Sequence, residues 1–158
     1  PQCRKVVGED VDYQNMLACY PPSNSQVGCE FGAQVMADFD PSTGRFVSPL
    51  ARDAQAHFRF ESTGIVNGCS EDGTATVELL NLNHKTLVHD RAAVIRGSLQ
   101  PKGKKLSAQA ARRLAHQALQ PDAQQRLPAY AVAIAQTALQ FAEREERRAA
   151  RMKKKGGV

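Results

Sequence analysis

Apolar and polar residues alternate along residues 56–96, and this stretch dominates the predicted fold. Ala56, Phe58 and Phe60 occupy every second position there, which is the period of a half-buried strand. The apolar runs of the stretch cover residues 56–61, 64–66, 74–80, 85–88 and 93–96. The pattern therefore predicts four or five short strands in a small barrel or a strongly twisted antiparallel sheet.

The order of these runs resembles the layout of SH3-like and Tudor-like barrels. In those barrels an acidic-glycine turn precedes a long central strand, and here residues 71–73 (Glu-Asp-Gly) precede the run at residues 74–80. The resemblance implies a small antiparallel barrel. It implies no ligand-binding cage, because Phe58 and Phe60 are the only aromatic residues of the stretch and both are expected to face the core.

Two further elements are expected before residue 56. Residues 13–20 repeat apolar side chains at helical spacing and are followed by Pro21, so they predict a short N-terminal helix. Residues 30–40 alternate strictly and predict a strand. A turn over residues 40–44 is expected to lead to a second arm at Phe46 and Val47.

The last third of the chain has a different pattern, with apolar residues at helical spacing. Ser107 is a suitable N-cap for a helix over residues 108–120, which Pro121 interrupts. A second helix is expected over residues 129–153. Its first half carries an apolar stripe and should be packed, whereas its second half is too polar to be buried.

These patterns predict an α+β protein with two domains. Residues 1–100 form a cysteine-containing, β-rich domain, a small antiparallel sheet or SH3-like barrel with a short N-terminal helix. Residues 101–158 form a basic, alanine-rich helical extension. The chain has 158 residues, and no stretch of it approaches the ~20 apolar residues needed to cross a bilayer.

Charge is divided unevenly between these two parts. Residues 1–100 hold 8 Lys or Arg and 12 Asp or Glu, whereas residues 101–158 hold 13 and 4, so a net charge of +5 combines −4 with +9. Such segregation is typical of a segment that binds a polyanion, which can be nucleic acid, an anionic membrane surface or an acidic protein.

The basic residues of the helical part are the candidate binding residues. Two clusters that flank one helical unit can contact phosphates at two places. They are Lys102, Lys104, Lys105, Arg112 and Arg113, and then Arg144, Arg147, Arg148, Arg151, Lys153, Lys154 and Lys155. The low aromatic content argues against single-strand binding by base stacking.

Four cysteines, Cys3, Cys19, Cys29 and Cys69, all lie in the first domain. They contain no Cys-x-x-Cys pair, so no metal site is predicted. One or two disulfides or four reduced thiols both fit this distribution. If disulfides form, we favour Cys29 paired with Cys19 or Cys3.

Other potentially reactive residues are better explained as surface or turn residues. His84 and His89 are five positions apart, an odd spacing that would place them on opposite sides of a strand. Asp40 is suited to capping the turn at Pro41, with Asp38 solvated. No phosphate loop or nucleophile motif is present, so no catalytic residue or cofactor is predicted.

We therefore expect a non-enzymatic structural component that binds an anionic partner. The partner that we favour is structured RNA within a larger ribonucleoprotein assembly. The alternative is an exported or organellar, disulfide-stabilised subunit of an envelope or secretion complex that takes part in protein–protein interaction. Salt-dependent RNA binding would distinguish the first hypothesis, and oxidised cysteines the second.

Overall fold

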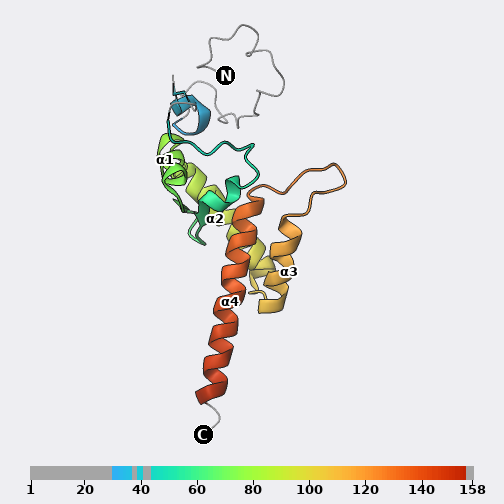
Figure 1. Ribbon diagram of the computed structural model, residues 1–158. Helices are drawn as coiled ribbons and strands as arrows, with labels where there is room; N and C mark the ends of the chain where they lie inside the picture. The colour runs from blue at the N-terminus through green and yellow to red at the C-terminus, as the bar shows by residue number, and fades with distance from the viewer. Residues whose placement is uncertain (1–29, 37–38, 41–43, 156–158) are drawn as a thin grey trace. The chain divides into compact units, whose positions relative to one another are not determined.

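The structure, a computed structural model, describes residues 30–36, 39–40 and 44–155. The elements that Figure 1 labels divide between two compact units. Of the described residues, unit 1 comprises those between 30 and 58 together with residues 66–85, and unit 2 comprises residues 59–65 and 86–155. The expected N-terminal helix and residues 41–43 of the expected turn lie outside the described residues.

Unit 1 contains helix α1, Glu71–Leu79, which begins at a well-formed cap. The Ser70 hydroxyl accepts a hydrogen bond from the Gly73 N–H at 3.0 Å. This contact satisfies a helix-start N–H group that has no acceptor in the helix. Glu71 and Asp72 lie in the first turn, where their negative charges interact favourably with the helix dipole and stabilise the helix.

The sheet has two strands, β1 (Phe58–Phe60) and β2 (Val66–Gly68). The strands are antiparallel, since the Cys69 N–H donates to the His57 carbonyl at 2.8 Å and the Glu61 N–H donates to the Ile65 carbonyl at 2.9 Å. The expected α+β class is thus confirmed at this coarse level. The barrel is not formed by the described residues, because the predicted strand over residues 74–80 is helix α1.

The predicted strand over residues 30–40 is also wrong where it is described. Gly32–Met36 is a 3-10 helix, η3. The Gly32 N–H donates to the Leu80 carbonyl at 2.8 Å, and the Asn81 side-chain amide donates to the Glu30 carbonyl at 2.7 Å. The segment therefore forms its hydrogen bonds with the residues that follow α1. A strand needs a neighbouring strand to pair with, and alternation in the sequence does not show whether one is present.

The predicted second arm at Phe46 and Val47 is not a strand either. The Val47 N–H donates to the hydroxyl of Thr76, a buried residue of α1, at 2.8 Å. A second 3-10 helix, η4, covers Ala54–His57 and leads directly into β1. A helical side chain thus satisfies the backbone that a partner strand was expected to satisfy.

Unit 2 is a helical core. Helix α2 (Lys85–Leu99, with Lys85 assigned to unit 1) replaces the predicted strands at residues 85–88 and 93–96. The 3-10 helix η5 (Pro101–Gly103) leads to α3 (Ala108–Ala118), and α4 covers Ala131–Lys155. The buried core residues are Ile95, Leu99, Ala111, Ala115, Ala118, Ala133, Ile134, Ala135, Ala138, Phe141 and Ala142.

Small side chains dominate this core, and they let α3 and α4 pack closely. Both helices were predicted from the sequence, and the Ser107 hydroxyl caps α3 as expected, accepting from the Ala110 N–H at 3.2 Å. The packed first half of α4 and its exposed second half are likewise confirmed. Because Ile95 and Leu99 share this core, packing continues across residue 100. The domain boundary placed there stays a prediction.

Residues 59–65 form a strap held on unit 2 by polar contacts. The Phe60 N–H donates to the Gln136 side-chain oxygen at 3.0 Å, and the Gln140 amide donates to the Phe60 carbonyl at 3.1 Å. Arg91, which is buried, donates from Nε to the Gly64 carbonyl at 2.7 Å. Gly64 has φ +88°, and a Cβ there would overlap the Val88 carbonyl, so glycine is required.

Candidate functional site

The candidate binding surface lies at one end of unit 2, where α3 begins and α4 continues past it. The two helices are antiparallel (Figure 1). Arg112 of α3 makes a bidentate contact with Glu146 of α4, with N···O distances of 2.9 and 2.8 Å. This contact shows the register of the two helices, in which the start of α3 lies beside the middle of α4.

The linker lysines lie at the same end, because α3 starts directly after them. Lys102, Lys104 and Lys105 are exposed. Lys102 adopts a left-handed conformation with φ 54° inside η5, a backbone conformation that is uncommon for residues other than glycine. The fold thus brings the first predicted cluster close to the second, which sequence alone could not establish.

The exposed half of α4 carries most of the charge. Arg144, Arg148 and Arg151 recur at helical spacing and share one face. The guanidinium of Arg144 lies 5.5 Å from the Phe141 ring centroid, a cation–π contact that leaves its charge in place. Residues 143–155 extend over about 20 Å at the usual rise of an α-helix.

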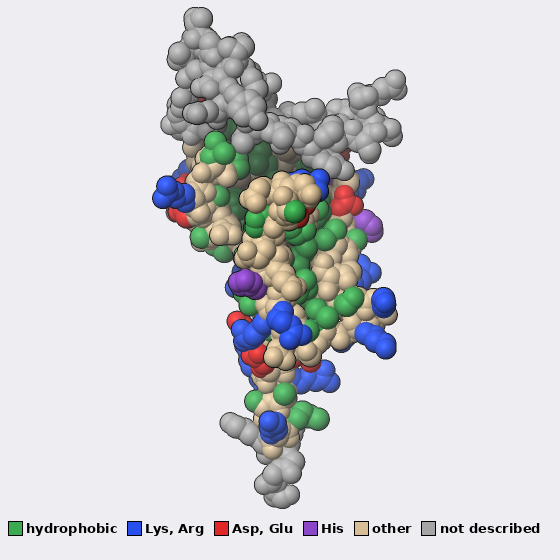
Figure 2. Space-filling model, turned by 90° about the vertical axis from the view of Figure 1, so that its right-hand side faces the viewer, with side chains coloured by type: hydrophobic (Ala, Val, Ile, Leu, Met, Phe, Trp, Pro, Cys, Tyr) green, Lys and Arg blue, Asp and Glu red, His purple; other side chains and the backbone are tan. Residues whose placement is uncertain are grey.

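Figure 2 shows Lys and Arg side chains, with Asp and Glu among them, gathered over this end of unit 2. Two of the twelve candidate residues are paired: Arg112 with Glu146, and Arg147 with Glu143 at 3.1 Å. Eight further candidate side chains are described, and no carboxylate of the described residues lies within ion-pair distance of any of them. They are Lys102, Lys104, Lys105, Arg113, Arg144, Arg148, Arg151 and Lys153. The side chains of Lys154 and Lys155 lie outside the described residues.

The Arg112–Glu146 pair changes the ionisation of both partners. The hydrogen bond from Arg112 lowers the pKa of the Glu146 carboxyl, and the same contact raises the pKa of Arg112. Both groups therefore stay charged at neutral pH and neutralise each other. Arg112 is a weaker candidate for phosphate binding than its neighbour Arg113.

A shallow pocket of about 340 Å³ lies along α3 beside this pair. It is lined by Gln109, Arg112, Arg113, His116 and Gln117. Sequence reasoning selected the two arginines but missed the other three residues. Their spacing of three or four residues marks the exposed face of one helix, and this was the signal that could have found them.

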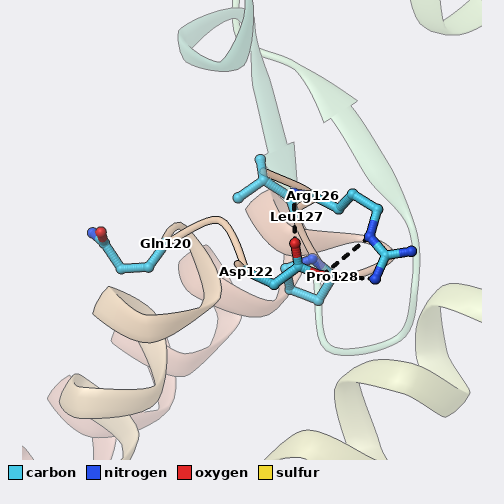
Figure 3. Close-up of a pocket in the computed structure, with 5 residues that line it drawn as sticks. All are labelled: Gln120, Asp122, Arg126, Leu127 and Pro128. Carbon is cyan, nitrogen blue, oxygen red and sulfur yellow. Dashed lines mark hydrogen bonds and ion pairs between the residues drawn. The ribbon is translucent and has the colours of Figure 1, made fainter. Parts of the chain in front are cut away.

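A second pocket, of about 390 Å³, lies in the loop between α3 and α4 (Figure 3). It is lined by Gln120, Asp122, Arg126, Leu127 and Pro128. Asp122 accepts a backbone hydrogen bond from Arg126 at 2.8 Å, which lowers the pKa of that carboxyl, and it also pairs with the Arg126 guanidinium at 3.0 Å. These contacts join two residues of the same loop, so Asp122 and Arg126 stabilise the turn and their charged groups bind each other.

The structure describes one of the four disulfide candidates, Cys69, and both histidines that were considered as metal ligands, His84 and His89. Cys69 is exposed and has no disulfide partner among the described residues, and Cys3, Cys19 and Cys29 lie outside them. In the described ranges no group of three or more His, Cys, Asp or Glu is placed to hold a metal ion. His84 pairs with Glu30 at 2.8 Å, and His89 is exposed on α2. Disulfide formation stays a prediction.

No helix in the described part of the chain is long and apolar enough to cross a membrane. Comparison with known proteins gives no family model, no curated protein and no solved structure that matches this chain significantly. The geometry of the site is therefore the only basis for a function.

Proposed function

We propose that the protein is a structural component of a larger assembly and that the basic end of unit 2 binds structured RNA. The observation that carries this proposal is the convergence of the linker lysines, Arg113 and the exposed half of α4 at one end of a packed helical core. Eight described basic side chains there have no carboxylate partner among the described residues.

The arrangement favours contacts with phosphates over contacts with bases. Beyond Phe141, α4 has no aromatic side chain that could stack on a base. Exposed arginines along a helix contact backbone phosphates and orient a protein without reading sequence. Double-stranded RNA is recognised mainly by its shape and its phosphates, so this surface suits a duplex or a folded RNA.

Binding of this kind has a defined salt dependence. Each phosphate neutralised releases counterions, so about four to eight contacts would give a slope of log K against log salt near −4 to −7. We expect the full chain to bind a folded RNA hairpin in fluorescence anisotropy and to lose affinity steeply as salt rises. Equal affinity at low and high salt would contradict the proposal.

A matched pair of variants tests the location of the surface. Arg148 is exposed on the basic half of α4, whereas Arg126 lies in the α3–α4 loop, paired with Asp122. We expect Arg148→Gln to weaken RNA binding and to reduce the salt slope by about 1, and Arg126→Gln to change neither. Equal effects of the two variants would show that net charge, and not this surface, governs binding.

A further inference from the structure

Three polar residues of unit 1 form an arrangement that the sequence gives no reason to expect. Ser70 Oγ lies 2.7 Å from His57 Nδ1. On the other side of the imidazole, His57 Nε2 lies 3.7 Å from an Asp53 carboxylate oxygen. A hydroxyl, an imidazole and a carboxylate in this order are the parts of an activated nucleophile.

General-base activation requires the tautomer with the proton on His57 Nε2 and with Nδ1 as an acceptor. The Asp53 carboxylate, 3.7 Å from Nε2, is beyond hydrogen-bond distance, but its charge lies on the side of the ring that favours this tautomer. The Ser70 oxygen already accepts from the Gly73 N–H at 3.0 Å. Its own proton is therefore available for donation to Nδ1, the direction that general-base activation requires.

Close backbone contacts bring the segments that carry the pair together. The His57 carbonyl accepts from the Cys69 N–H at 2.8 Å. A Cβ at Gly73 would overlap that same carbonyl, and a Cβ at Gly68 would overlap the backbone of Thr74. Two glycines thus let a strand, the serine and a helix approach closely, so that Ser70 stands at a sharp turn from β2 into α1.

The start of α1 supplies groups that could stabilise developing charge. The N–H groups of Glu71 and Asp72 belong to the first turn, where the helix itself offers no acceptor. Their side chains are exposed carboxylates, of which Glu71 is paired with Arg45. Negative side chains at the site disfavour anionic substrates and favour an uncharged or cationic ester.

We propose that Ser70 and His57 form an acyl-transfer site, with Asp53 as a positioning residue, that accepts an uncharged or cationic carboxylic ester. Ser70 Oγ attacks the ester carbonyl carbon while its proton passes to His57 Nδ1. The alcohol leaves with that proton, and an acyl-serine remains. Water then attacks the acyl carbon, releases the carboxylic acid and restores the serine.

This site lies in unit 1 and is independent of the RNA-binding proposal for unit 2. It was missed in the sequence because Asp53, His57 and Ser70 match no linear nucleophile motif. The proposal would replace the expectation of a non-enzymatic protein. RNA binding by the basic surface of unit 2 is tested by separate experiments.

The chain provides its own control for the test. Ser107 is also a helix N-cap, with its hydroxyl 3.2 Å from the Ala110 N–H, and it lies outside the contacts of His57. We expect a fluorophosphonate probe, incubated with the full chain and mapped by mass spectrometry, to modify Ser70 and leave Ser107 unmodified. Absence of the Ser70 adduct, or equal modification of the two serines, would overturn the proposal.

Variants then separate chemistry from capping. Ser70→Ala and Ser107→Ala both remove a capping hydroxyl, but only Ser70→Ala should abolish hydrolysis of p-nitrophenyl acetate.

His57→Gln should slow phosphonylation of Ser70 by about 100-fold, the usual contribution of a general base. Asp53→Asn should lower kcat with KM unchanged, which a purely structural role would not produce. Unchanged rates in His57→Gln would overturn the assignment, and the comparison of Ser70 with Ser107 in the native chain decides the question if a variant fails to fold.

Discussion

The two halves of helix α4 have the same backbone conformation and opposite surroundings. Among residues 131–142 only Leu139 is exposed, whereas among residues 143–153 none is buried. The first half is stabilised by packing of small side chains against α2 and α3. The second half consists of strong helix formers with an Arg147–Glu143 pair one turn apart. Changes in the first half should therefore affect folding, and changes in the second half should affect binding.

The strongest test of this difference places the same new charge in each half. Ala138 is fully buried and Ala150 is exposed. We expect Ala138→Asp to lower the free energy of unfolding by about 3 kcal/mol or more, because it buries a carboxylate without a partner. Ala150→Asp should change it by no more than about 0.5 kcal/mol. Urea unfolding followed by circular dichroism measures both, and similar losses would contradict the division of α4.

A smaller effect is expected from the contact between the packed half and the strap. Gln136→Leu leaves the Phe60 N–H without its side-chain acceptor. Loss of a hydrogen-bond partner by a partly buried group costs about 1–3 kcal/mol, and the amide of Phe60 should exchange faster with solvent. Gln117→Leu, an exposed change on α3, is the matched control. Unchanged exchange at Phe60 would show that this glutamine does not hold the strap.

The same contrast explains which elements could be predicted from sequence. Helices α3 and α4 carry their signals locally: the Ser107 cap, the break at Pro121 and alanine at helical spacing. The basic clusters could also be selected from the sequence, because the charge of a Lys or Arg residue can be recognised without knowing which residues it contacts. Their convergence could not, because it depends on how the small side chains of α3 and α4 pack together in the core.

Helices α1 and α2 were predicted as strands for identifiable reasons. The buried face of α2 is Arg91, Ile95 and Leu99, and the arginine interrupts the apolar period that marks a helix. In α1 the alternation of residues 74–80 suggested a strand. Ser70, followed by two acidic residues, was a helix-start signal that was interpreted as a turn. Local capping outweighed alternation there, since no partner strand is present in the described residues.

A change in binding without unfolding is expected when the pair at the junction of the two halves is broken. Glu146→Gln removes one negative charge and frees Arg112. We expect tighter RNA binding and a salt slope steeper by about 1, because one more cation can contact phosphate. Asp122→Asn frees Arg126 at the opposite end of α3 and serves as the control. An equal gain from both variants would argue against a localised surface.

The smallest expected effect is the acid dependence of that same pair. The Arg112 hydrogen bond lowers the pKa of Glu146 below its ordinary value of 4.5. A carboxyl whose folded-state pKa is lowered stabilises the fold above its unfolded-state pKa, and this stabilisation is lost as pH falls through the folded-state pKa. The difference in unfolding free energy between the native chain and Glu146→Gln should therefore be constant at neutral pH and shrink as pH falls below the ordinary value of 4.5 and through the lowered pKa of Glu146. Urea unfolding across this range measures the difference. A difference that stays the same at acid pH would mean that the pair contributes through packing of its side chains and not through charge.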